Sequence, residues 1–343
     1  MNHRVMKKSI NEDPIAHDPA TSIIGHSATI AGLHKTIASE RIHHTLLFTG
    51  PSGVGKKRVA KSLAMTFMCL QYHQDGSRQI PSFGGCTMCH HCKLMHAGNL
   101  PDLITVACDD KSAASTESVR ELLNSLRLRP FAGTYRFLIF DDAHLLQGAA
   151  ANALLKSLEE PRPGTFFILL TDKPHLMLRT IHSRAQRWGF HHLTNEELAK
   201  VLQANGEEVR ARCVELASGS ISSYSLIKEQ GEELTALHDE LKAIAMGDHA
   251  AALRLGSTFA QDRENLKEKI ACLHLLARSE MLQTRQLCWA NFIYELGEFE
   301  YYLLKRNFAP LYLFQNLFLH LAESFQDQFI LEQDGLLESL IPS

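Results

Sequence analysis

The sequence lacks an excess of positive charge. Its 35 lysine and arginine residues stand against 38 aspartate and glutamate residues, which gives a formal net charge of −3 and a pI of about 6.7. A protein that binds nucleic acid through its overall field is usually basic. We therefore expect any contact with nucleic acid to use a local basic face or to be made through partner proteins.

Long apolar segments are also absent. No run approaches the roughly 20 apolar residues of a membrane-spanning helix, and the N-terminal segment MNHRVMKKSINEDP lacks the apolar core of a signal peptide. We therefore expect no membrane partner and a cytoplasmic location. In that compartment the eight cysteines favour a metal site or buried thiols over a disulfide framework.

Alternating strands and helices are present instead. Short apolar segments predict strands at TLLFTG, PDLITVAC, YRFLIFDD and TFFILLTD, and HSRAQRWGF leads into a fifth. Helical segments such as GAAANALLKSLEEP lie between them, which indicates a parallel sheet covered on both faces. After about His191 helices dominate, beginning with TNEELAKVLQANG, whose Thr–x–x–Glu start is typical of a helix cap. We expect an α/β domain followed by two helical domains.

A glycine-rich turn lies between the first predicted strand and its helix, in HTLLFTGPSGVGKKRVAKSL. It fits the phosphate-binding P-loop pattern G-x-x-x-x-G-K-[ST] up to its last position. Backbone N–H groups of such a loop and the start of the helix attract phosphate, whereas a purely structural turn is the alternative. The candidate nucleotide-binding residues are Gly50, Pro51, Ser52, Gly53, Val54, Gly55, Lys56 and Lys57.

Lys57 is the departure from this pattern. A serine or threonine hydroxyl at this position would reach Mg²⁺, but an ammonium group cannot ligate a cation. Catalysis of phosphoryl transfer depends on a well-placed metal ion. We therefore expect impaired ATP hydrolysis, while the sequence leaves nucleotide binding open in either direction.

Two carboxylates follow the third predicted strand, in FLIFDDAH. In P-loop NTPases the first acid holds Mg²⁺ and the next polarises the attacking water, so Asp141 and Asp142 are candidates for these roles. Two acids that merely end a strand are the alternative. Thr171, at the end of the fourth strand, could sense a γ-phosphate, although a threonine at a strand end is usually structural.

Three cysteines lie close together in CTMCHHC. Cys86, Cys89 and Cys92 form two successive C-x-x-C spacings, which are typical of a structural zinc site. Cys69, at the end of the P-loop helix, is the leading candidate for the fourth ligand. Free thiols or a redox pair are the alternatives, but no thioredoxin-like context surrounds the motif. Other candidates for the fourth ligand are His73, His90, His91, His96 and Cys108.

Arg184 lies in TIHSRAQRW, before the fifth predicted strand. An arginine there could be an ordinary surface residue. It could also serve a nucleotide bound to a neighbouring subunit, because its planar, always-charged guanidinium group suits phosphate oxygens.

Taken in order, these features resemble the clamp-loader group of AAA+ ATPases. The most specific run is GAAANALLKSLEEPRPGTFFILLTDKPHLMLRTIHSRAQRW, which contains the N-A-L-L-K-x-L-E-E-P helix and sensor strand of that group. The group's S-R-C motif reads Ser183–Arg184–Ala185 here. A zinc cluster after the P-loop helix, followed by AGNLPDLITV, also matches, although Cys69 lies further from the triplet than the first cysteine usually does. The resemblance covers about residues 20–230.

The resemblance implies three domains. These are an AAA+ P-loop domain over 1–190 with an inserted zinc module over 69–92, a helical lid over 191–235, and a helical collar over 236–343. It also implies a subunit of bacterial DNA polymerase III that helps to load the sliding β clamp on primer–template DNA. The implied partners are gamma/tau and delta subunits in a five-membered ring.

The same resemblance implies that Arg184 acts in trans, as an arginine finger on a neighbouring ATPase subunit. Lys57 then favours a stator subunit without ATPase activity of its own. The alternative is a gamma/tau-like motor subunit that tolerates Lys57. A zinc-dependent nucleic-acid binder is a third reading, which the low net charge and the lack of interleaved aromatic residues around CTMCHHC oppose.

Overall fold

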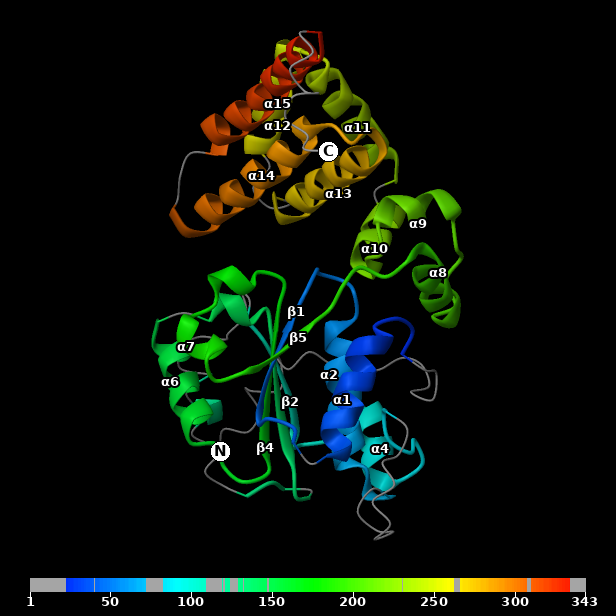
Figure 1. Cartoon of the computed structure of the whole chain (residues 1–343), viewed down its shortest axis with the longest axis vertical. Coiled ribbons are helices and arrows are strands. Elements are labelled where there is room, and N and C mark those ends of the chain that lie inside the picture. The colour runs from blue at the N-terminus through cyan, green and yellow to red at the C-terminus, as the bar shows by residue number, and fades with distance from the viewer. Residues whose placement is uncertain are drawn as a thin grey trace, which may run out of the picture. The chain divides into compact units, whose positions relative to one another are not determined.

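The computed structural model describes most of the chain, in two compact units. The described residues are 23–39, 41–71, 83–108, 119, 121–123, 129–131, 133–146, 148–229, 231–261, 266–306 and 310–333. One unit comprises Met1–Val209 with Gly219–Ile221, and the other comprises Arg210–Ser218 with Ser222–Ser343 (Figure 1). The three-domain division into 1–190, 191–235 and 236–343 stays a prediction.

A five-stranded parallel sheet forms the centre of the first unit. Its strands are β1 (Thr45–Thr49), β2 (Leu103–Ala107), β3 (Arg136–Asp141), β4 (Thr165–Thr171) and β5 (Gln186–Gly189). Their order is β2-β3-β4-β1-β5, and every pairing is parallel. All of β1 is buried, as in parallel sheets that are covered on both faces. The predicted α/β fold is thereby confirmed.

Helices cover both faces of this sheet. One face packs against α1 (Ser27–Ala38), α2 (Lys56–Met68) and α4 (His90–His96), and the other packs against α6 (Gly148–Glu159) and α7 (Arg179–His182) (Figure 1). Side chains alternate between the faces along a strand. Consequently, Phe137 and Ile139 of β3 belong to the first core, whereas Leu138 and Phe140 belong to the second.

Short elements follow the strands at one edge of the sheet. The turns η2 (Ala143–Leu145) and η3 (Pro174–Leu176) come after β3 and β4, and α8 (Asn195–Ala204) comes after β5. As predicted, α8 begins with a capping box, in which Thr194 and Glu197 bond each other's backbone N–H groups. Because parallel strands end together, this edge gathers the P-loop after β1, the acids after β3 and the residues after β4.

The second unit is helical. It contains α9 (Ala211–Ala217), most of α10 (Ile221–Glu229), α11 (Gly231–Ala245), α12 (His249–Gln261), α13 (Leu266–Thr284), α14 (Leu287–Arg306) and α15 (Pro310–Gln333). Aromatic residues form its core, with Phe259 and Phe318 in edge-to-face contact at 5.6 Å. Within the described part of the chain, no helix has both the length and the apolar character needed to span a membrane.

Candidate nucleotide-binding site and metal centre

The glycine-rich loop after β1 has the backbone shape that its sequence predicts. Gly50, Gly53 and Gly55 have φ angles of 149°, 70° and 101°, which side-chain-bearing residues rarely adopt. A Cβ atom at Gly50 would also collide with the Phe190 carbonyl group. Helix α2 starts directly after Gly55, at Lys56, so that its N-terminus faces the loop. This geometry matches a phosphate-binding turn.

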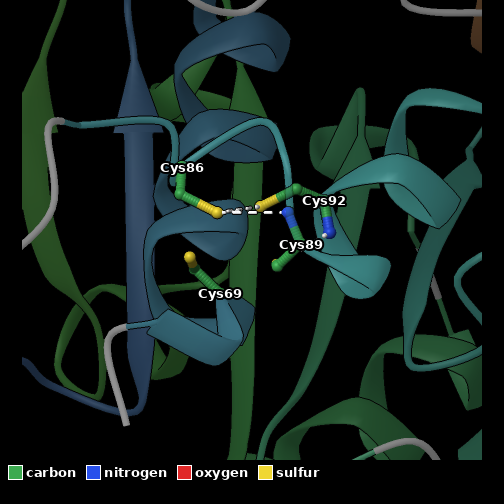
Figure 2. Close-up of side chains that lie close together, drawn as sticks. All are labelled: Cys69, Cys86, Cys89 and Cys92. Atoms are coloured by element: carbon green, nitrogen blue, oxygen red, sulfur yellow. Dashed lines mark hydrogen bonds between the residues drawn. The ribbon is translucent and has the colours of Figure 1, made fainter. Parts of the chain in front are cut away.

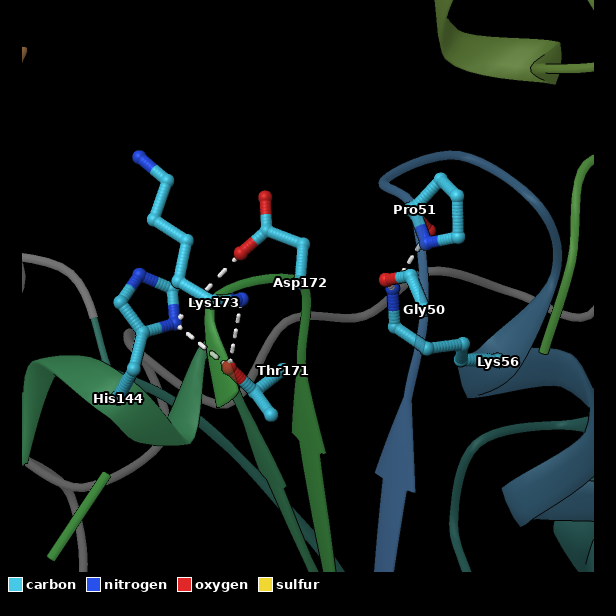
Figure 3. Close-up of polar contacts among 7 residues, drawn as sticks. All are labelled: Gly50, Pro51, Lys56, His144, Thr171, Asp172 and Lys173. Carbon is cyan, nitrogen blue, oxygen red and sulfur yellow. Dashed lines mark hydrogen bonds and ion pairs between the residues drawn. The ribbon is translucent and has the colours of Figure 1, made fainter. Parts of the chain in front are cut away.

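Lys56 is bound by its own loop. Its Nζ donates hydrogen bonds to the carbonyl oxygens of Gly50 at 2.7 Å and Pro51 at 2.6 Å (Figure 3). Burial lowers the pKa of Lys56, partly offset by the carboxylates of Asp172, Asp142 and Asp141. The ammonium group that would bind phosphates therefore takes carbonyl oxygens as its partners here.

Lys57 forms an ion pair with the acid at the end of β3. Its Nζ lies 3.3 Å from Asp141 Oδ2, and the two side chains are 27% and 33% exposed. The ammonium group thus contacts the carboxylate on which a magnesium ion would depend, and it offers no ligand in return. The residues present do not fit a magnesium site of the usual P-loop kind.

Asp142 has left-handed backbone geometry, with φ at 52°. Partial burial, followed by the nearby charges of Asp141 and Asp172, raises the pKa of Asp142 to about 6. Its neighbourhood is therefore rich in negative charge. The positive charge of Lys56 lowers the pKa of Asp142, but by less than burial and the two carboxylates raise it.

Thr171, the last residue of β4, is buried. His144 Nδ1 lies 3.1 Å from Thr171 Oγ1 and 3.6 Å from Asp172 Oδ1, and the Lys173 N–H donates to Thr171 Oγ1 at 3.0 Å (Figure 3). The threonine hydroxyl is thus already engaged by protein groups. His144 was not among the residues predicted from the sequence. Its position two residues after the acid pair, in DDAH, is the signal that could have found it.

An apolar pocket adjoins the loop, and it was not predicted from the sequence. His26 Nε2 lies 2.8 Å from the Val54 carbonyl oxygen, and its ring meets Phe190 edge-on at 4.9 Å. The Ile221 N–H donates to the Gly53 carbonyl at 2.8 Å, which ties a residue distant in sequence to the loop. The pocket is lined by Ile23, Ile24, His26, Val54, Gly55, Arg58, Leu193, Val201, Ala204 and Ile221.

The four predicted cysteines come together. Cys69 follows α2, and Cys92 lies in α4. The Sγ atoms of Cys69, Cys86, Cys89 and Cys92 all lie within 4.8 Å of one another (Figure 2). Cys86 Sγ and Cys92 Sγ are 3.9 Å apart. A tetrahedral zinc ion with Zn–S bonds of about 2.3 Å separates its sulfurs by roughly 3.8 Å. The spacing therefore fits zinc.

Backbone groups support the cluster. The Cys89 N–H donates to Cys86 Sγ at 3.3 Å, and the Cys92 N–H donates to Cys89 Sγ at 3.4 Å. Burial raises the pKa of Cys86, but the N–H groups of Cys89 and Met88, together with the side chains of Cys69 and Cys89, outweigh burial and lower this pKa to about 7. Burial, with the neighbouring sulfur groups, raises the pKa of Cys92. Without a cation, the four thiols cannot all ionise readily.

Two of the alternative ligands have other surroundings. His91 Nδ1 lies 2.9 Å from the Met68 carbonyl oxygen, and Cys108 belongs to the core on the opposite face of the sheet. Neither they nor His90 and His96 appear in the four-cysteine group. His73 lies outside the described residues.

Arg184 lies in the turn after α7. Its Nη2 is 2.8 Å from Glu159 Oε1, and its Nη1 donates to the Thr180 carbonyl at 3.1 Å. The side chain is 36% exposed. Its contacts with described residues thus involve neither the P-loop nor the acids after β3.

The matching family model and the curated relatives below all describe subunits of DNA polymerase III. Residues 25–194 match the family model described as DNA polymerase III, delta subunit. The tau subunit of DNA polymerase III from Bacillus subtilis is 30% identical over 202 residues, which cover 58% of this chain and 34% of that protein. The tau/gamma subunit from Haemophilus influenzae is 30% identical over 234 residues, which cover 66% of this chain and 31% of that protein. The matched region thus spans about a third of the length of these relatives.

Among solved structures, a DNA polymerase III gamma subunit-related protein from Thermotoga maritima aligns with 87% of this chain and 99% of its own. The identity is 16% and the TM-score is 0.41. The family match and the two curated relatives, rather than this alignment, show the family of the chain. It belongs to the clamp-loader family of AAA+ proteins.

Proposed function

We propose that this chain is a delta-prime-type stator subunit of a bacterial DNA polymerase III clamp loader. The ion pair between Lys57 and Asp141 carries the proposal. A motor subunit needs a hydroxyl group and an unobstructed carboxylate to hold Mg²⁺, whereas a stator needs neither. Lys57 supplies one charge where hydrolysis requires a divalent cation, so this subunit does not hydrolyse ATP at a useful rate.

The proposed role of Arg184 is to act on a neighbour's nucleotide. Its guanidinium group is partly exposed, and its contacts are with Glu159, Thr180 and Ser183 rather than with the subunit's own loop. In the assembled loader it would contact the phosphates held by an adjacent motor subunit and stabilise the charge that develops during hydrolysis. The expected neighbours are gamma/tau and delta subunits in a ring of five, which loads the β clamp on primed DNA.

The proposed zinc ion has a structural role. Cys69, Cys86, Cys89 and Cys92 would hold it, with the four sulfurs closing the coordination shell. A closed shell leaves no position for a substrate or a water molecule. The ion would tie the end of α2 to α4.

A gamma/tau-like motor is the second candidate. The loop keeps the phosphate-binding glycines and Lys56, and the curated relatives named above are tau and gamma subunits. In that case the contact between Lys57 and Asp141 would have to open when magnesium-bound ATP arrives.

Turnover of Mg-ATP separates the two candidates. We expect the purified chain to hydrolyse ATP no faster than its Lys56→Ala variant, alone and with primed DNA. Clear turnover that disappears in Lys56→Ala would reject the stator. The variant matters because it distinguishes activity of this loop from a contaminating ATPase.

A further inference from the structure

Glu159, the last residue of α6, is in direct contact with Arg184. Glu159 Oε1 lies 2.8 Å from Arg184 Nη2, and the two side chains are 50% and 36% exposed. Arg184 Nη1 also donates to the Thr180 carbonyl at 3.1 Å and to Ser183 Oγ at 3.2 Å. Two separate elements, α6 and the turn after α7, therefore hold the guanidinium group.

These contacts leave part of the guanidinium group accessible. They use Nη1 and Nη2, while Nε makes no contact with the described part of the chain. Nε is thus the donor left for a phosphate oxygen, and a guanidinium group donates strong, charge-assisted hydrogen bonds to phosphate. The held arginine can therefore still receive an anion from outside.

The contact with Glu159 can orient the Arg184 side chain without preventing it from binding a phosphate. An exposed ion pair is weak, whereas a bidentate pair between arginine and phosphate is strong. Glu159 cannot compete with a phosphate for the whole guanidinium group. It can, however, restrict the rotamers of a long side chain before the phosphate arrives, which reduces the entropy lost on contact.

We propose that Glu159 is a positioning residue, which holds Arg184 in the orientation that a neighbouring subunit's nucleotide requires. The inference rests on the proposed function of Arg184. The chain offers a matched control in Glu160, which is also exposed and takes no part in the contacts of Arg184. Glu159→Gln and Glu160→Gln remove the same charge from adjacent positions.

The test uses the reconstituted loader, with kcat and KM for ATP measured in the presence of primed DNA. We expect Glu159→Gln to lower kcat about two- to fivefold, the range of a weak ion pair, and to leave KM unchanged. Glu160→Gln should match the wild type. Arg184→Ala should lower kcat far more, and Glu159→Gln should add nothing in that background. Glu159→Asp should recover part of the rate.

Several results would overturn the inference and leave the proposed function standing. These are an unchanged or raised kcat in Glu159→Gln, an equal loss in Glu160→Gln, or a further loss on top of Arg184→Ala. Melting of the purified variants checks that Glu159→Gln retains the wild-type Tm, since a merely structural role would lower it. If Arg184→Ala itself leaves ATP hydrolysis unchanged, the trans role of Arg184 fails, and the role of Glu159 fails with it.

Discussion

At the residue scale, Lys57 places a fixed positive charge beside the acid that ends β3. Its Nζ lies 3.3 Å from Asp141 Oδ2, and Lys56 has the carbonyl oxygens of Gly50 and Pro51 as partners. The two lysines are adjacent in sequence but meet different partners, since one faces the loop and the other faces β3. A magnesium ion would have to displace Lys57 from Asp141.

Replacing Lys57 with threonine should restore magnesium-dependent nucleotide binding. The variant supplies a hydroxyl ligand and frees the Asp141 carboxylate. We expect ATP to bind Lys57→Thr about tenfold more tightly with Mg²⁺ than with a chelator, whereas the wild type gains little from the metal. Titration calorimetry measures both. Lys57→Arg keeps a cation opposite Asp141 and should behave as the wild type, and a Lys57→Thr variant without this gain would contradict our interpretation.

A second pair of charges, Arg136 and Asp102, is buried at the other end of the sheet. Arg136 Nε lies 3.0 Å from Asp102 Oδ1, which also accepts the Phe131 N–H at 3.0 Å. Removing one member leaves an uncompensated buried charge, so we expect Arg136→Met to lower the free energy of unfolding by about 3–5 kcal/mol. Urea denaturation measures this loss. Arg162→Met, at an exposed position, should change it by less than about 0.5 kcal/mol.

At the element scale, the sequence predicted the strands and the motif-bearing turns well. β1 and β3 are almost continuous apolar runs, and such runs have few other stable arrangements than a covered parallel sheet. The glycines of the loop were equally informative, because φ values of 70° to 149° suit few other residues. Local patterns therefore specify these elements without knowledge of their neighbours.

Contacts between distant elements could not be predicted in this way. The pairing of Lys57 with Asp141 joins α2 to β3, and the pairing of Glu159 with Arg184 joins α6 to the turn after α7. Both depend on side-chain direction and helix placement, which periodicity does not determine. Cys69 was named as a candidate ligand, but only the packing of α4 beside the end of α2 brings the four sulfurs together.

Loss of the proposed zinc ion should loosen the connection between α2 and α4. We expect about one zinc ion per chain after purification without chelators, and a lower Tm after its removal, because metal binding to a preformed cluster contributes to folding stability. Cys92→Ser should lose the metal. Cys213 lies outside the cluster, so Cys213→Ser should retain the metal. Less than about half an equivalent of zinc in the wild type would reject the four-cysteine site.

At the scale of the whole molecule, the chain has two compact units, and each has a core of its own. In the first unit, Leu154 of α6 is fully buried against the sheet. In the second unit, Phe318 of α15 is fully buried among Phe259, Phe292 and Phe314. The candidate nucleotide-binding loop and the four-cysteine cluster therefore belong to one folding unit, while the helical unit has an aromatic core that involves neither.

Separate cores predict separate responses to core mutations. Truncating a fully buried leucine or phenylalanine costs about 2–5 kcal/mol, which corresponds to a fall in Tm of roughly 5–15 °C for units of this size. We expect calorimetry to resolve two transitions, with Leu154→Ala lowering one and Phe318→Ala lowering the other. Leu178→Ala and Leu253→Ala, at leucines that are 43% and 44% exposed in the first and second units, are the matched controls. The proposed zinc ion would be held by the first unit, so chelation should lower the transition that Leu154→Ala lowers. A single transition that shifts equally in all of these variants would contradict independent cores.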